Sequence, residues 1–352
     1  MSGRVALCGL GLVIGLVARP QDSTRTVEWS AYLEPYFAYD VDGPGSGERP
    51  PFLYNHVRTS EFNVNLGLVQ AAYSGQRVRG TIGLMAGTYV QYNMVNEAPA
   101  LRHVHEASIG YKLSRSRELW LDAGIFPSHI GAESAIGAEN PTLTRSLMAE
   151  GSAYYEAGLK LNYGPSDKWS ISVLVLNGWQ RIQRQAGNTT PAFGTQVLFE
   201  PDDRLTVNWS TFFGSDVPDS VGLYRAFSDL YATYGDEQRS ATMAVDVGIQ
   251  QSSDPDGAVD GWLTLAAIYR ERFLRNWWVV GRMEYFLDDG RIILDRDVLL
   301  GGSLGVDREL TRDLIWRFEA RLFSDPDQGF LDADEQPKGT NLGLTTSLCL
   351  TL

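Results

Sequence analysis

The sequence predicts an all-β protein: a transmembrane, antiparallel, up-and-down β-barrel of 16 strands. Three observations lead to this fold class. Sixteen segments alternate apolar and polar residues with a period of two, which is typical of strands with two unlike faces. Short and long connections alternate between the segments, and an apolar leader precedes them. Transmembrane barrels combine short turns on one side with long loops on the other, whereas a soluble sandwich has no reason to do so.

Composition restricts the alternatives. The 352 residues could form two ordinary domains or one large all-β domain. The net charge of -13 argues against nucleic acid as a partner, because nucleic acid requires a basic surface. With 11% aromatic residues and 36 glycines, the chain has enough apolar area to fold and does not look disordered. After the leader, no stretch reaches about 18 consecutive apolar residues, so membrane-spanning helices are not expected.

Residues 1–18 are predicted to be a signal peptide. Arg4 precedes an apolar run from Val5 to Val17, and Ala18 supplies a small residue at its exit. The run is too short to span a bilayer as a helix. Cleavage near Ala18 would leave residues 19–352 as a single barrel domain with Cys349 alone, so no disulfide could form within it. The leader predicts export.

Tight turns and long loops connect the alternating segments in a regular order. They lie near residues 27–39, 58–73, 77–93, 104–114, 118–126, 153–164, 168–177, 191–200, 203–214, 226–234, 239–251, 260–270, 275–287, 297–307, 313–323 and 340–352. Even-numbered segments end in tight turns built from turn residues, such as Gly164-Pro165-Ser166-Asp167. Odd-numbered segments end in long loops, of which residues 127–152 form the third in our count. Several segments have the length that a tilted strand needs to cross a bilayer.

The last segment shows the two faces most clearly. Leu342, Leu344, Leu348, Leu350 and Leu352 lie on one face, with polar or small residues on the other. In a membrane barrel the apolar face contacts lipid and the polar face lines the lumen, where the charged strand residues then lie. The predicted lumen wall comprises Glu61, Glu106, Asp122, Glu156, Arg282, Glu284, Arg317, Glu319 and Arg321. Because unpaired buried charge is costly, we expect water in the lumen.

Aromatic residues near segment ends predict girdles at the membrane boundary, although strand propensity alone also favours these residues.

Several sequence runs resemble a known family. They are Tyr54-Asn55-His56-Val57-Arg58, Glu61-Phe62-Asn63, Gly87-Thr88-Tyr89, Asp122 to Gly131, Leu143-Thr144-Arg145-Ser146, Tyr154-Tyr155-Glu156-Ala157-Gly158, Asn177 to Ile182 and Pro218-Asp219-Ser220. Together they resemble the OmpL-like group of outer-membrane β-barrel porins. Ala153 stands where this pattern has proline, and the chain ends in Leu352 rather than an aromatic residue. The resemblance implies an outer-membrane pore.

The loop at residues 127–152 looks like the third loop of general porins, which folds into the barrel and narrows it. The resemblance therefore implies that this loop folds toward the lumen and constricts it. The charged residues that it would bring there are His129, Glu133, Glu139, Arg145 and Glu150. The alternative is a surface flap that never enters the lumen. Rings of fixed charge select ions by sign, and the pore width filters solutes.

These features predict a porin that forms a water-filled channel for passive diffusion of ions and small hydrophilic solutes, with a weak preference for cations. The alternative is a plugged structural or adhesive barrel. No nucleophile lies beside a base in a recognisable catalytic motif, so we expect no enzyme and no catalytic residues. The pair His103 and His105 is a weak metal signal, and no metal or cofactor is expected. The expected location is the outer membrane of a Gram-negative-type bacterium, with its lipids as partners and a homo-oligomer as an option.

Overall fold

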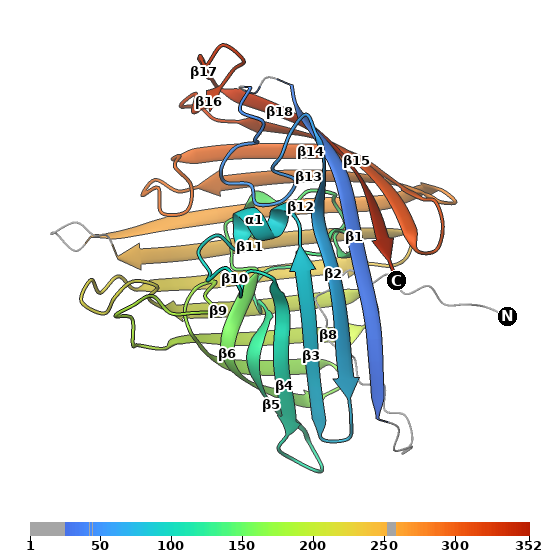
Figure 1. Ribbon diagram of the computed structural model, residues 1–352, viewed down its shortest axis with the longest axis vertical. Helices are drawn as coiled ribbons and strands as arrows, with labels where there is room; N and C mark the ends of the chain where they lie inside the picture. Colours follow the sequence, from blue (N-terminus) through green and yellow to red (C-terminus); the bar gives the residue numbers. More distant parts are fainter. Residues whose placement is uncertain (1–24, 42, 44, 252–257) are drawn as a thin grey trace.

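The computed structural model describes residues 25–41, 43, 45–251 and 258–352, so the predicted leader lies outside the described residues. Sixteen antiparallel strands form one closed barrel in which each strand pairs with its neighbours along the chain (Figure 1). The first strand also pairs with the last, with Tyr32 opposite Thr351 and Asp40 opposite Gly343. Closure leaves no unpaired sheet edge, which is the condition for a sheet to lie in lipid. The predicted fold class is confirmed.

The strands follow the predicted segments closely. The barrel contains β1 (Thr26–Asp40), β2 (Phe62–Ser74), β3 (Val78–Ala86), β4 (Val104–Lys112), β5 (Glu118–Pro127), β6 (Tyr155–Ser166), β7 (Trp169–Leu176), β8 (Ala192–Asp202), β9 (Leu205–Gly214), β10 (Arg225–Gly235), β11 (Arg239–Gln251), β12 (Val259–Leu274), β13 (Trp277–Leu287), β14 (Val298–Glu309), β15 (Leu314–Ser324) and β18 (Thr340–Thr351). A small ladder of β16 (Phe330–Leu331) and β17 (Pro337–Lys338) lies in the last loop. The helical segments are α1 (Thr88–Asn93), η1 (Gly137–Glu139) and α2 (Leu147–Glu150).

Inward and outward residues alternate along each strand. On β13, Met283 is 75% exposed, while its neighbours Arg282 and Glu284 are 2% and 5% exposed. Leu304 on β14 is likewise 70% exposed. The exposed face is apolar and the enclosed face carries the charges, which is the arrangement of a barrel surrounded by lipid. In the part of the chain that the structure describes, no helix is long and apolar enough to cross a membrane.

One predicted segment is broken by a helix. The alternation at residues 77–93 predicts a single strand, but β3 ends at Ala86 and α1 begins at Thr88. Gly87, between them, has φ of 135°, and a Cβ there would lie 2.3 Å from the Asn65 carbonyl oxygen. Only glycine fits this position, because other residues rarely adopt that φ and would collide with β2. The prediction of a continuous strand here is wrong.

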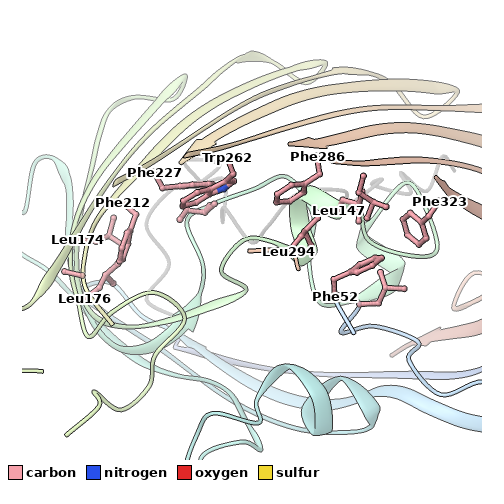
Figure 2. Close-up of a cluster of buried hydrophobic side chains, with 14 of the residues drawn as sticks. Phe52, Leu147, Leu174, Leu176, Phe212, Phe227, Trp262, Phe286, Leu294 and Phe323 are labelled. Atoms are coloured by element: carbon pink, nitrogen blue, oxygen red, sulfur yellow. The ribbon is translucent and has the colours of Figure 1, made fainter. Parts of the chain in front are cut away.

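The interior is not uniformly polar. A cluster of buried apolar side chains extends along the inner face of the wall from β7 to β15 and includes residues from four loops (Figure 2). Its main members are Phe52, Leu147, Leu174, Leu176, Phe212, Phe227, Trp262, Phe286, Leu294 and Phe323. Phe286 and Phe323 are 1% and 0% exposed. Apolar burial therefore attaches the loop segments to the wall.

Candidate pore constriction

The loop between β5 and β6 has an internal framework centred on Arg145, which is fully buried. Its guanidinium donates to the carbonyl oxygens of Ser134 at 2.6 Å, Ala135 at 2.7 Å and Leu143 at 2.8 Å. Ser146 caps α2, because its hydroxyl accepts a hydrogen bond from the Ala149 N–H. Arg145, one of the charges predicted for the constriction, therefore lies inside the loop and orders it.

One side of this loop is bound to the wall at β13 and β15. The Thr144 N–H donates to Glu319 Oε2 at 2.9 Å, and the Leu147 N–H donates to Glu284 Oε2 at 2.6 Å. Arg282 in turn donates to the Thr144 carbonyl at 2.6 Å. Backbone groups of a loop need partners when they are buried, and here wall charges provide them. The loop therefore lies against the inner wall, opposite the strands from which it leaves.

Two more wall arginines complete this contact. Arg317 donates to the carbonyl oxygens of Gly137 and Pro141, each at 2.7 Å, and pairs with Asp307 at 2.8 Å. Arg321 pairs with Glu284 at 2.8 Å. The predicted wall residues Arg282, Glu284, Glu319 and Arg321 thus form one network of ion pairs, whereas Arg317 pairs with Asp307. All five predicted residues are at most 5% exposed.

The other side of the loop is held by His129. Its Nδ1 lies 2.9 Å from Glu156 on β6, and its Nε2 lies 2.9 Å from the carbonyl oxygen of Thr211 on β9. Burial disfavours the charged imidazole, but the Glu156 carboxylate outweighs burial and raises the pKa of His129. The Gly131 N–H adds a contact to Asp229 on β10 at 3.2 Å. The loop is therefore anchored at both ends.

Glu150 connects this loop to the first loop, residues 41–61. Its carboxylate accepts hydrogen bonds from the Tyr54 N–H at 3.0 Å and from Asn55 Nδ2 at 3.3 Å. Burial raises the pKa of Glu150 to about 7. The link between the two loops is therefore sensitive to pH near neutrality.

A cavity of about 100 Å³ separates the loop from the wall at β2, β3 and β4. Three carboxylates, Glu106, Glu133 and Glu139, are among its lining residues, together with Gln70 and His105. Burial raises the pKa of Glu139. All three carboxylates are partly exposed, unlike the arginines on the opposite wall. Asp122, deeper on β5, is partly exposed as well and pairs with Arg79.

Glu61 differs from the other predicted wall residues. It lies one residue before β2, its side chain is 41% exposed, and it pairs with Arg58 of the first loop at 3.0 Å. Glu61 therefore lies at the end of the first loop, outside the strand. Asp307, which the sequence analysis did not single out, is 2% exposed and pairs with two wall arginines, Arg270 and Arg317. Asp307 lies on the inward face of the predicted segment 297–307, and this position could have identified it from the sequence as a wall residue.

Metal ligands do not gather in the described part of the chain: no group of three or more His, Cys, Asp or Glu side chains could hold an ion there. His103 precedes β4, and its Nδ1 lies 3.1 Å from the Met85 carbonyl oxygen. His105 lies at the register shift between β3 and β4. His103 is exposed, whereas His105 lines the cavity between the loop and the wall.

Comparisons with solved structures agree with this architecture. The chain is similar to an anion-selective porin from Comamonas acidovorans, with a TM-score of 0.62 and 8% identity, over 94% of this chain and 100% of that one. It is similar to the outer-membrane channel DcaP of Acinetobacter baumannii, with a TM-score of 0.61 and 9% identity, over 93% and 97% of the chains. The trimer form of OmpT from Vibrio cholerae matches with a TM-score of 0.58 and 10% identity, over 94% and 100%. At these identities the likeness establishes the fold alone.

Among curated proteins, none matches the chain. A family model does: the model described as "Putative beta-barrel porin-2, OmpL-like" matches residues 26–352. This match covers all sixteen strands of the barrel. The chain therefore belongs to the OmpL-like beta-barrel porin-2 family, a family of outer-membrane porins.

Proposed function

We propose that the protein is a passive diffusion channel for ions and small hydrophilic solutes, weakly selective for cations. Export by the leader at residues 1–18 would deliver residues 19–352 to the outer membrane of a Gram-negative-type bacterium. Porin family membership supports the channel role. The trimer form of one structural relative supports assembly as a homo-oligomer.

The proposed ion preference rests on the unequal distribution of charged side chains inside the barrel. The arginines of β13 and β15 are buried and paired with carboxylates, and Arg282 and Arg317 also bind the loop. The carboxylates of Glu106, Glu133 and Glu139 line the cavity on the other side of the loop and remain partly exposed. A passage next to accessible carboxylates attracts cations, because fixed charge selects ions by sign. Its selectivity is weak, because bulk salt screens the charges over about 10 Å.

Reversal potentials in a salt gradient across planar bilayers test the ion preference. Wild-type channels should be modestly cation-selective, and the double variant Glu106→Gln/Glu139→Gln should shift the reversal potential toward zero. The control is Glu335→Gln, which removes an exposed charge in the last loop and should leave the potential unchanged. Anion selectivity of the wild type, or an unchanged potential in the double variant, would refute the proposed cation pathway.

The apolar cluster favours a second candidate, a plugged structural or adhesive barrel. It lies inside the barrel and includes Phe52, Leu147 and Leu294 from three different loops. Packed apolar side chains exclude water, so a plug built in this way would not conduct. Channel activity separates the two candidates.

A further inference from the structure

Two arginine side chains with free donors lie close together near the first loop. Arg49, in that loop, is 4% exposed, and Arg321, on β15, is 1% exposed. Among the described residues, no protein group accepts a hydrogen bond from Arg49 Nε, Arg49 Nη2 or Arg321 Nη1. Buried donors are normally satisfied, because each unsatisfied one costs free energy. A hydrogen-bond acceptor next to these three nitrogen atoms would therefore lower the free energy of the site.

A glycine on β18 brings the two guanidinium groups to the same part of the wall. A Cβ on Gly343 would lie 2.8 Å from Arg49 Nη2, so the Arg49 guanidinium occupies the space that a side chain would fill. Gly343 is the register partner of Arg321 on β15 and of Asp40 on β1. Arg49 Nη1 donates to Thr345, also on β18, at 3.3 Å. The site is thus built from β15, β18 and the first loop.

The surrounding carboxylates are already occupied. Arg321 uses Nε and Nη2 to pair with Glu284 on β13, at 3.0 Å and 2.8 Å. Asp40 accepts two hydrogen bonds from Asn341 Nδ2, each at 2.8 Å. Burial, and then repulsion by Arg321, lowers the pKa of Arg49 to about 10, although Asp40, Glu319 and Glu150 act in the opposite direction. None of these carboxylates accepts a hydrogen bond from the three free nitrogen atoms.

We propose that Arg49 and Arg321 form a binding site for one small oxyanion, a carboxylate or phosphate group, held next to Gly343. Guanidinium donors match the oxygens of both groups in charge and geometry. An oxyanion there would accept hydrogen bonds from the free nitrogens and relieve the repulsion between the two arginines. The site goes beyond the proposed channel function. Solutes that carry such a group would be retained in the interior, while simple cations pass by the carboxylates on the opposite side of the loop.

Titration calorimetry on the folded, detergent-solubilised barrel tests the site, with inorganic phosphate and succinate as probes in a chloride buffer. The wild type should show saturable binding of at least one probe, and Arg49→Gln should weaken it by about ten-fold or more. The matched control is Arg58→Gln, which removes the same charge from the same loop but from an exposed ion pair. It should retain the wild-type affinity. Binding of phosphate alone or of succinate alone would support the site and identify its preferred oxyanion.

Gly343→Ala gives an independent check, because it keeps both arginines and adds only a methyl group where Arg49 lies. It should also weaken binding. Slower migration of heated than of unheated protein on gels verifies that each variant has folded. Absence of saturable binding in the wild type, or equal losses in Arg49→Gln and Arg58→Gln, would overturn the site. Because no conductance is measured, this outcome would leave the channel proposal standing.

Discussion

Arg145 and Arg317 show how single side chains shape the interior. Both bind backbone carbonyl oxygens of the loop between β5 and β6, so their charges hold the chain in place and are not displayed to water. Charge and position in the sequence identify such residues as candidates. Their partners come from distant strands and loops, so the sequence pattern does not distinguish an exposed lumen charge from one that anchors a loop.

Glu150 predicts a pH dependence of stability. Its pKa is raised by burial to about 7, so the folded state binds a proton that the unfolded state releases near pH 4.5. Stability contributed by this group is therefore present below about pH 4.5 and is lost as the pH rises to about 7, by roughly 3 kcal/mol. Glu150→Gln should flatten this part of the profile of unfolding midpoints measured in detergent. An identical decline in the variant would contradict the assignment.

Gly87 predicts a large cost for a small substitution. Gly87→Ala places a methyl group against the Asn65 carbonyl oxygen at a backbone conformation that alanine rarely adopts. We expect a loss of more than about 2 kcal/mol in the free energy of unfolding. Gly45→Ala is the control, because no atom lies within 4 Å of a Cβ built there. Equal denaturant midpoints for the two variants would contradict the proposed steric role of Gly87.

At the scale of the elements, the period-two alternation predicts all sixteen strands because each has one face toward lipid and one toward the interior. The end of β3 escapes prediction, since it depends on the contact between Gly87 and Asn65 of the neighbouring strand. The contacts of the constriction loop escape prediction for the same reason, because they join residues that are distant in the sequence. His129 and Glu150 are recognisable as charged loop residues, but Thr211 and Tyr54, which bind them, are not recognisable as their partners.

Deletion of residues 132–142 tests the role of the loop. The deletion removes the carbonyl groups of Gly137 and Pro141 that bind Arg317, together with the carboxylates of Glu133 and Glu139. Single-channel conductance should rise, and cation preference should fall because Arg317 becomes accessible. Deletion of residues 332–335, at the exposed tip of the last loop, should change neither quantity. Unchanged conductance in the first variant would show that the loop does not limit the passage.

For the whole molecule, the account requires an apolar exterior in contact with lipid. A nitroxide label on Met283→Cys, at the 75% exposed position of β13, should collide with dissolved oxygen more often than with a water-soluble nickel complex. A label on Ser116→Cys, in an exposed short turn, should show the opposite order. Cys349 is 1% exposed and should remain unlabelled. Preferential collision of the Met283→Cys label with the nickel complex would place this face in water.

The most direct test of the central claim is the single-channel conductance of the purified wild-type barrel in planar bilayers. The account predicts discrete conductance steps that persist in symmetric salt, because the proposed passage along the cavity between the loop and the wall at β2 to β4 would admit hydrated ions. A folded, membrane-inserted barrel that gives no steps would contradict the channel and would favour the plugged barrel.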